Sequence, residues 1–153
     1  MKILVDTCGW IEWLTDGQLR KQYEPYFNKL NSMIAPTSVQ FELYKWVARK
    51  KGIQQALETI ALTEQAEIIP LSTSIALSAA DFSAEHKLSF AYAIIYASAQ
   101  FHKASLITSD DHFKGLSDVI FIEKKIRRSF IAVALLVPVL MHPGGTEPWV
   151  FTL

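Results

Sequence analysis

The sequence contains a single cysteine, Cys8, and therefore lacks any internal disulfide. A free thiol is typical of reducing compartments, and no signal-peptide pattern stands before the first apolar run, so we expect a cytoplasmic protein. The chain also lacks net charge, because 15 Lys and Arg residues are balanced by 15 Asp and Glu residues. This balance argues against a protein that is basic throughout, but a local basic rim remains compatible with RNA binding.

No apolar run reaches the roughly 20 residues that a membrane-spanning helix needs, so we expect no membrane association. The longest run, "FIAVALLVPVLM" at residues 130–141, is too short and contains Pro138. Internal repeats and linkers are absent from the sequence as well. We interpret residues 1–125 as one domain and residues 126–153 as an atypical hydrophobic tail. An added hairpin, a partner-dependent segment and a non-native sequence are all open explanations for the tail.

Short β-branched runs alternate with helical patterns along the chain. Strands are predicted at residues 2–5, 32–37, 66–71, 104–110 and 117–123. Helices are predicted from about Gly9 and at residues 18–30, 38–50, 52–65, 72–87 and 89–103. Strands that alternate with helices form parallel sheets through right-handed crossovers. The pattern therefore predicts an α/β fold, a three-layer α/β/α sandwich with a central parallel sheet of about five strands.

Acidic residues follow two of the predicted strands and open one helix. Asp6 ends the first strand in "VDTCGW", Asp110 ends the fourth, and Glu42 lies one turn into the helix after the second. Each has a simple structural explanation, as a helix cap or as a surface acid near a helix start. Ligands of open α/β sheets, however, bind at the carboxyl ends of the strands. We therefore expect Asp6, Glu42 and Asp110 to meet at one edge of the sheet.

Clustered carboxylates repel one another unless a cation neutralises them. All-oxygen sites of this kind suit Mg²⁺ or Mn²⁺. Such an ion lowers the pKa of a bound water and stabilises the charge of a phosphoryl transition state. The predicted site therefore favours a phosphodiester substrate.

Four stretches then occur in order: "VDTCGWIEWLTDG", "SVQFELYKWV", "AADFSAEHKLSFAYAIIYASAQ" and "LITSDDHF". In these stretches, and over residues 1–125 as a whole, the sequence resembles the PIN-domain ribonucleases, most closely the VapC-type toxins of toxin–antitoxin pairs. The resemblance implies an endoribonuclease with Mg²⁺ or Mn²⁺ at four acidic positions, which are here Asp6, Glu42, Tyr92 and Asp110. It also implies RNA as the substrate, a homodimer, and inhibition by a cognate VapB-like antitoxin.

Tyr92 departs from the pattern, because the resemblance implies "SFADAIIYA" where this chain reads "SFAYAIIYA". A phenol has a pKa near 10, so it is neutral at pH 7 and a poor ligand for Mg²⁺. It is also bulkier than an aspartate. We interpret Tyr92 as a disabled ligand position that impairs catalysis. Without the resemblance, an aromatic residue facing the core is the simpler interpretation.

Several neighbours of the acids are further candidates. Thr7, Thr108, Ser109 and Asp111 are possible contacts of substrate or water, although capping explains the hydroxyl residues equally well. His112 is the one histidine close to the acids in sequence.

The helix predicted at residues 38–50 and the two early helices carry further side chains with open roles. Helical periodicity leads us to expect Phe41, Tyr44 and Val47 on the core side of the helix. "RKK" at 49–51 suits a helix end and also a phosphate backbone. The aromatic residues of the early helices suit either the core or a partner surface; they are Trp10, Trp13, Tyr23, Tyr26 and Phe27.

The sequence is compatible with three functions. The first is a metal-dependent endoribonuclease toxin impaired by Tyr92. The second is a catalytically inactive PIN-fold binding module that sequesters antitoxin or RNA. The third is a metal-dependent phosphatase or flap-type nuclease acting on DNA, which shares the same kind of acidic edge.

Overall fold

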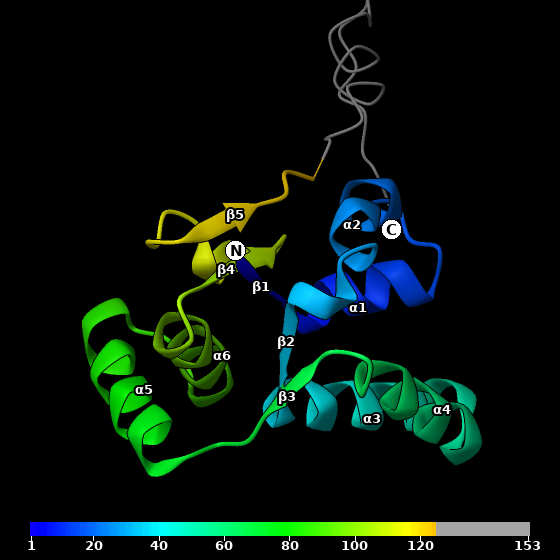
Figure 1. Ribbon diagram of the computed structural model, residues 1–153, viewed down its shortest axis with the longest axis horizontal. Helices are drawn as coiled ribbons and strands as arrows, with labels where there is room; N and C mark the ends of the chain where they lie inside the picture. Colours follow the sequence, from blue (N-terminus) through cyan, green and yellow to red (C-terminus); the bar gives the residue numbers. More distant parts are fainter. Residues whose placement is uncertain (125–153) are drawn as a thin grey trace, which may run out of the picture.

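The computed structural model describes residues 1–124, which form a five-stranded parallel sheet with six α-helices around it (Figure 1). The predicted tail, residues 126–153, lies outside the described residues. The strands stand in the order β3-β2-β1-β4-β5, and every neighbouring pair is parallel. Their bounds are β1 (Lys2–Val5), β2 (Met33–Pro36), β3 (Glu67–Ile69), β4 (Ala104–Thr108) and β5 (Val119–Phe121).

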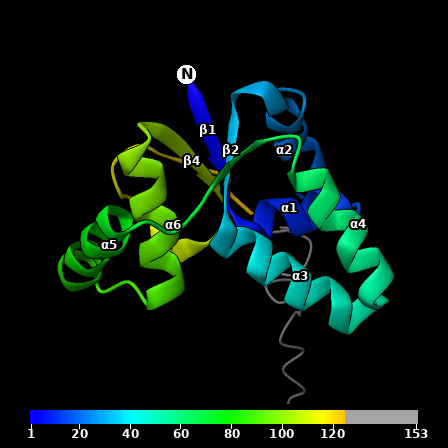
Figure 2. The ribbon, with the colours of Figure 1, turned by 60° about the horizontal axis from the view of Figure 1, so that its bottom comes forward.

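The helices cover both faces of the sheet, which confirms the predicted three-layer α/β/α architecture. They are α1 (Thr7–Leu14), α2 (Arg20–Phe27), α3 (Thr37–Lys51), α4 (Ile53–Thr63), α5 (Thr73–His86) and α6 (Phe90–Phe101). Figures 1 and 2 show α1 to α4 on one side of the strands and α5 and α6 on the other. The chain runs from β1 outward to β3 and then returns to β4 beyond β1. Because the crossovers are right-handed, this reversal moves the later helices to the opposite face.

The central strands β1, β2 and β4 are buried along most of their length. Leu4, Val5, Leu106 and Ile107 have no exposed surface. This burial on both faces explains why these strands read as continuous apolar runs and not as alternating ones. Val5 of β1 pairs with Ile107 of β4. The residues that follow these two strands therefore emerge at the same edge of the sheet.

The buried face of α3 differs from the expected one. The structure buries Val39, Leu43 and Val47, which repeat every four residues. Phe41 is 66% exposed and Tyr44 is 37% exposed, so the expectation that they point toward the core is wrong. Phe41 lies about 200° around the helix from Val39. The helix therefore presents its aromatic residues to the surface, and hydrophobicity alone does not indicate this.

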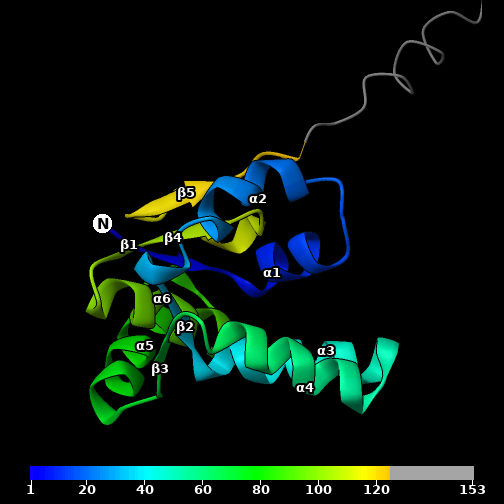
Figure 3. The ribbon, with the colours of Figure 1, turned by 45° about the vertical axis from the view of Figure 1, so that its right-hand side comes forward.

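The structure confirms the division between α3 and α4 and favours core packing for most of the early aromatic residues. Gly52, with φ of 93°, ends α3 and precedes α4, so the two helices run side by side (Figure 3). Trp10, Tyr23 and Phe27 are buried, and the rings of Trp10 and Phe27 lie 4.9 Å apart between α1 and α2. Core packing therefore explains most of the early aromatic residues. Within residues 1–124, no helix has both the length and the hydropathy needed to cross a membrane.

Gly9 in α1 provides a test of this packing. A Cβ at this position would lie 2.6 Å from Val5 Cγ1 and closer still to the fully buried Tyr23 ring. Although Ala is the better helix former, we expect Gly9→Ala to lower the free energy of unfolding by about 1–2 kcal/mol. Urea denaturation measures the change.

The double variant Gly9→Ala/Tyr23→Leu is the control. Because the smaller side chain removes the nearer of the two collision partners, the cost of Gly9→Ala should shrink in the Tyr23→Leu background. An equal cost in both backgrounds would contradict this explanation of the glycine.

Candidate functional site

The four positions that the resemblance implies lie around one pocket of about 250 Å³ at the carboxyl edge of the sheet. Asp6 follows β1, Glu42 lies in α3, Tyr92 lies in α6 and Asp110 follows β4. The structure thus brings together side chains from four separate segments. The full lining is Asp6, Thr7, Cys8, Ile11, Glu42, Trp46, Tyr92 and Asp110.

Asp6 is both the cap of α1 and part of the pocket wall. Its Oδ1 accepts a hydrogen bond from the Thr7 backbone N–H at 2.7 Å. Its Oδ2 accepts from the Thr108 hydroxyl at 2.9 Å and from the Cys8 thiol at 3.3 Å. Asp6 therefore combines the two roles that the sequence left open, a helix cap and an acid at the carboxyl edge of the sheet.

The burial of Asp6, which is 3% exposed, determines its electrostatics. Burial raises the pKa of Asp6 from 3.8 to about 6, even though hydrogen bonds from Thr108, Cys8 and Thr7 favour the charged form. The negative charge of Glu42 raises the pKa of Asp6 further. All hydrogen-bond donors to the Asp6 carboxylate are neutral, so they stabilise its negative charge without neutralising it.

Thr7 connects the two acids on this side of the pocket. Its backbone N–H is bound to Asp6, and its hydroxyl donates to Glu42 Oε2. Because Thr7 opens α1 while Glu42 belongs to α3, this hydrogen bond holds the two helices at a fixed separation at the pocket. Thr7 thus lies beside both acids.

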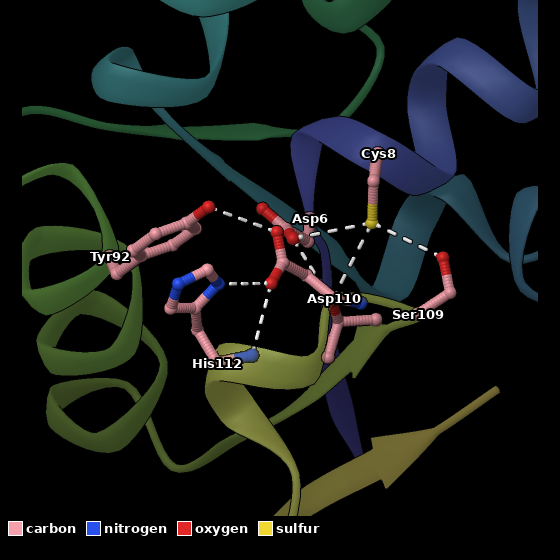
Figure 4. Close-up of polar contacts among 7 residues, drawn as sticks. Asp6, Cys8, Tyr92, Ser109, Asp110 and His112 are labelled. Carbon is pink, nitrogen blue, oxygen red and sulfur yellow. Dashed lines mark hydrogen bonds and ion pairs between the residues drawn. The ribbon is translucent and has the colours of Figure 1, made fainter. Parts of the chain in front are cut away.

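Asp110 is held by a different set of partners (Figure 4). The Tyr92 hydroxyl donates to Asp110 Oδ2 at 3.0 Å, and His112 Nδ1 lies 2.6 Å from Oδ1. The backbone N–H of His112 also donates to Oδ1. The rings of Tyr92 and His112 stack with their centroids 4.3 Å apart. Both oxygens of Asp110 are therefore occupied by protein donors.

These contacts affect the pKa values of Asp110 and Tyr92 in opposite directions. Burial acts to raise the pKa of Asp110, but the hydrogen bonds from His112 and Tyr92 hold it below its usual range. Burial and the hydrogen bond to Asp110 raise the pKa of Tyr92 from 10.0 to about 12, and the charges of the nearby acids add to the effect. Tyr92 is therefore a neutral hydrogen-bond donor at physiological pH.

Cys8 was not among the predicted site residues, yet it lines the pocket. Its sulfur lies within 3.5 Å of the Thr108 and Ser109 hydroxyls. Burial, with the charge of Asp6, raises the pKa of the Cys8 thiol. A thiol with a raised pKa is a poor nucleophile, so Cys8 serves as a hydrogen-bond donor here. The one signal for it in the sequence is its place two residues after Asp6.

The remaining candidates divide into buried and exposed ones. Thr108 and Ser109 are buried and bind Asp6 and Cys8, so they support the pocket from behind. Asp111 is exposed at the start of the 3-10 turn η2 (Asp111–Phe113), and it does not line the pocket. Trp46, one helical turn after Glu42, lines the pocket without having been predicted.

The donor chemistry of the pocket fits a hard divalent cation at one end. Mg²⁺ usually binds through one or two carboxylates and keeps several waters. Asp6 and Glu42 are two such carboxylates, joined through Thr7, with no Lys or Arg among the described residues that line the pocket. Within residues 1–124, however, no three acidic, histidine or cysteine side chains already stand close enough to form a metal cluster. The end with Tyr92 and Asp110 fits an ion less well, because protein donors already occupy Asp110.

The raised pKa of Asp6 predicts a pH-dependent stability in the absence of divalent ions. A carboxyl whose pKa is higher in the folded state favours folding at low pH, and this contribution is lost as pH rises through the folded value. The free energy of unfolding should therefore fall between pH 3.8 and about 6, by up to about 3 kcal/mol, relative to Asp6→Asn. Urea denaturation of both proteins across this range, in the presence of a chelator, measures the difference. A difference that is constant with pH would contradict the assignment.

The solved structures that this chain resembles share its fold. A toxin–antitoxin complex from Klebsiella pneumoniae matches with a TM-score of 0.67 and 24% identity, over 78% of this chain and 96% of that chain. The toxin VapC20 of Mycobacterium tuberculosis, described as cleaving the sarcin–ricin loop, matches with a TM-score of 0.64 and 16% identity, over 80% and 98%. VapBC2 from Rickettsia felis, bound to a promoter DNA fragment, matches with a TM-score of 0.64 and 18% identity, again over 80% and 98%. A search of curated proteins found no significant match.

The family comparison rests on sequence and not on shape. The sequence model of the PIN-domain family matches residues 3–119, which include Asp6, Glu42, Tyr92 and Asp110. This match spans most of the chain and ends just before the part that the sequence had set apart as a tail. The chain therefore belongs to the PIN-domain family.

Proposed function

We propose that this protein is the toxin of a type II toxin–antitoxin pair, a metal-dependent endoribonuclease whose catalysis is impaired by Tyr92. The observation that carries the proposal is the meeting of Asp6, Glu42 and Asp110 at one pocket. Neutral partners leave the charge of Asp6 unbalanced, and a phosphodiester in complex with a divalent cation is the substrate chemistry that such a site supports.

Asp6 and Glu42 would hold Mg²⁺ or Mn²⁺ through their free lone pairs. When bound, the ion supplies an activated water and neutralises charge at the phosphate. Thr7 orients both carboxylates, and Thr108 and Cys8 keep Asp6 in its ionised form by donating to it. Asp110 is the remaining acid that can orient a water or a ligand, and Tyr92 restrains it.

Tyr92 impairs the site in two ways. It places a neutral phenol where the resemblance implies a carboxylate, and its hydroxyl occupies one oxygen of Asp110. The stacked His112 ring occupies the other oxygen. Both effects reduce the negative charge available to a cation at that end of the pocket, so weak ion binding and slow cleavage follow.

The partners follow from the same family relationship. Structures similar to this chain include a toxin–antitoxin complex from Klebsiella pneumoniae and VapBC from Salmonella typhimurium bound to DNA. We propose that this chain likewise forms a homodimer and binds a VapB-like antitoxin, and that it acts in the cytoplasm on RNA.

A second function is favoured by one specific observation. Tyr92, Asp110 and His112 form a closed set of hydrogen bonds and stacked rings, in which each oxygen of Asp110 already has a protein partner. A PIN-fold binding module that sequesters antitoxin or RNA without cleaving it is consistent with such a closed arrangement.

Asp6→Asn separates the two functions. If the protein is a metal-dependent ribonuclease, Mn²⁺ raises the melting temperature of the unaltered chain, because the ion binds only the folded state. Asp6→Asn should abolish this shift and lower RNA cleavage by more than about 100-fold. The exposed acid Asp81, in α5 on the opposite face of the sheet, provides the control Asp81→Asn.

The substrate panel contains RNA, single-stranded DNA, flapped DNA and a phosphate monoester. Cleavage of DNA or of the monoester in place of RNA would contradict the proposed substrate and support a flap-type nuclease or a phosphatase. Absence of both the Mn²⁺ shift and any cleavage would support the binding module.

Tyr92→Asp tests the proposed impairment. The variant adds a carboxylate to the pocket and releases Asp110 from the phenol, so we expect tighter Mn²⁺ binding and RNA cleavage at least about tenfold faster. Tyr92→Phe is the matched control, because it releases Asp110 but adds no ligand. Equal rates for Tyr92→Asp and the unaltered chain would contradict the impairment.

A further inference from the structure

A second hollow borders the acidic pocket on the exposed side of α3. Its volume is about 270 Å³, and its lining consists of Phe41, Glu42, Lys45, Trp46 and Arg49. Glu42 and Trp46 line both hollows. The surface therefore continues without interruption from the acids onto the outer face of α3.

Side chains of two kinds follow one another along this face. Phe41, Lys45 and Arg49 are spaced four residues apart, so they lie in a row on the helix surface. The Phe41 ring is two-thirds exposed, and Lys45 Nζ lies 6.0 Å from its centroid. We call Phe41, Lys45, Trp46 and Arg49 the α3 strip. The strip thus combines an exposed phenylalanine, a half-buried tryptophan and two exposed cations, which distinguishes it from the buried face of the same helix.

The charges of the strip and of the pocket are opposite. The acids repel any polyanion that approaches the pocket. Lys45 and Arg49 form no ion pair within residues 1–124, so their charges are available to an external partner. The last turn of α3 adds Lys50 and Lys51. A polyanion can therefore be held on α3 while one of its phosphates reaches the pocket.

We propose that the α3 strip binds unpaired RNA beside the scissile phosphodiester, with one base stacked on Phe41 and a backbone phosphate at Arg49. This inference rests on the proposed function and adds to it a surface on α3 that positions the RNA strand. Proteins that bind single strands combine aromatic stacking surfaces with cations that follow the backbone. A duplex presents no free base face to Phe41, and an apolar protein partner would leave the cations of the strip unmatched.

Binding of a fluorescein-labelled, unstructured RNA oligonucleotide tests the proposal. The measurement uses fluorescence anisotropy in the presence of a chelator, so that cleavage plays no part. Phe41→Ala should weaken binding by about 5- to 150-fold, the loss expected for one base stacked on an aromatic ring. Phe101→Ala is the matched control, because Phe101 is 54% exposed at the end of α6, outside the strip.

An abasic RNA of the same length isolates the stacking contribution. This probe keeps the phosphates and lacks the bases, so the unaltered chain and Phe41→Ala should bind it equally. A loss of the same size with the abasic probe would overturn the assignment of Phe41 as a stacking surface.

Arg49→Ala tests the phosphate contact through its salt dependence. Removal of one phosphate contact to a single strand should reduce the slope of log K against log salt by about 0.7. Lys29→Ala, at an exposed cation that does not line the hollow, should leave the slope unchanged.

The unaltered chain's affinity separates the possible outcomes. No measurable RNA binding, or equal affinities for the unaltered chain, Phe41→Ala and Arg49→Ala, would overturn the proposal. Because binding is measured without divalent ions, the outcome is independent of the cleavage assays. RNA binding through the strip by a chain that cleaves nothing would uphold this inference while the proposed nuclease function fails.

Discussion

The burial of Asp6 beside other acids is the constraint on which the site depends. Its hydrogen-bond donors are two side chains and one backbone N–H, all of them neutral. These donors stabilise a carboxylate only in part, because burial still raises the pKa of Asp6 to about 6. A cation bound beside Asp6 would stabilise the charged form of this carboxyl group. The pocket is thus organised around a deficit of positive charge at the carboxyl edge of the sheet.

The negative charges at the two ends of the pocket are stabilised in different ways. At the end with Asp6 and Glu42, the carboxylates are connected through Thr7 and keep lone pairs that face the pocket. At the other end, His112 and Tyr92 donate to Asp110 and hold its pKa low without any ion. Protein donors there stabilise the Asp110 carboxylate without an ion. Tyr92 therefore restrains a neighbouring acid, and in the proposed function it also removes one carboxylate from the site.

Helix α3 connects the pocket to the surface of the molecule. Its buried face, Val39, Leu43 and Val47, packs inward, while Glu42 reaches the pocket from the adjacent side. Phe41, Lys45 and Arg49 then continue outward beside Glu42. Because α3 carries Glu42 as well as these residues, the distance between Glu42 and the proposed RNA surface does not vary with loop motion. In the proposed function, α3 would thus position substrate as well as supply an acid.

Local patterns in the sequence were enough to predict the alternation of strands and helices and hence the three-layer parallel fold, because buried runs and helical spacing are local signals. It also predicted that Asp6, Glu42 and Asp110 share an edge, because the carboxyl ends of parallel strands do. Sequence patterns did not predict the strand order, the exposure of Phe41, the places of Cys8 and Trp46 in the pocket, or the contact of His112 with Asp110. These depend on how one helix is rotated against its neighbours and on which distant segments meet, and neither property is encoded in local periodicity. For the same reason, the hydrogen bond from Tyr92 to Asp110 follows from the fold and not from the residue type alone.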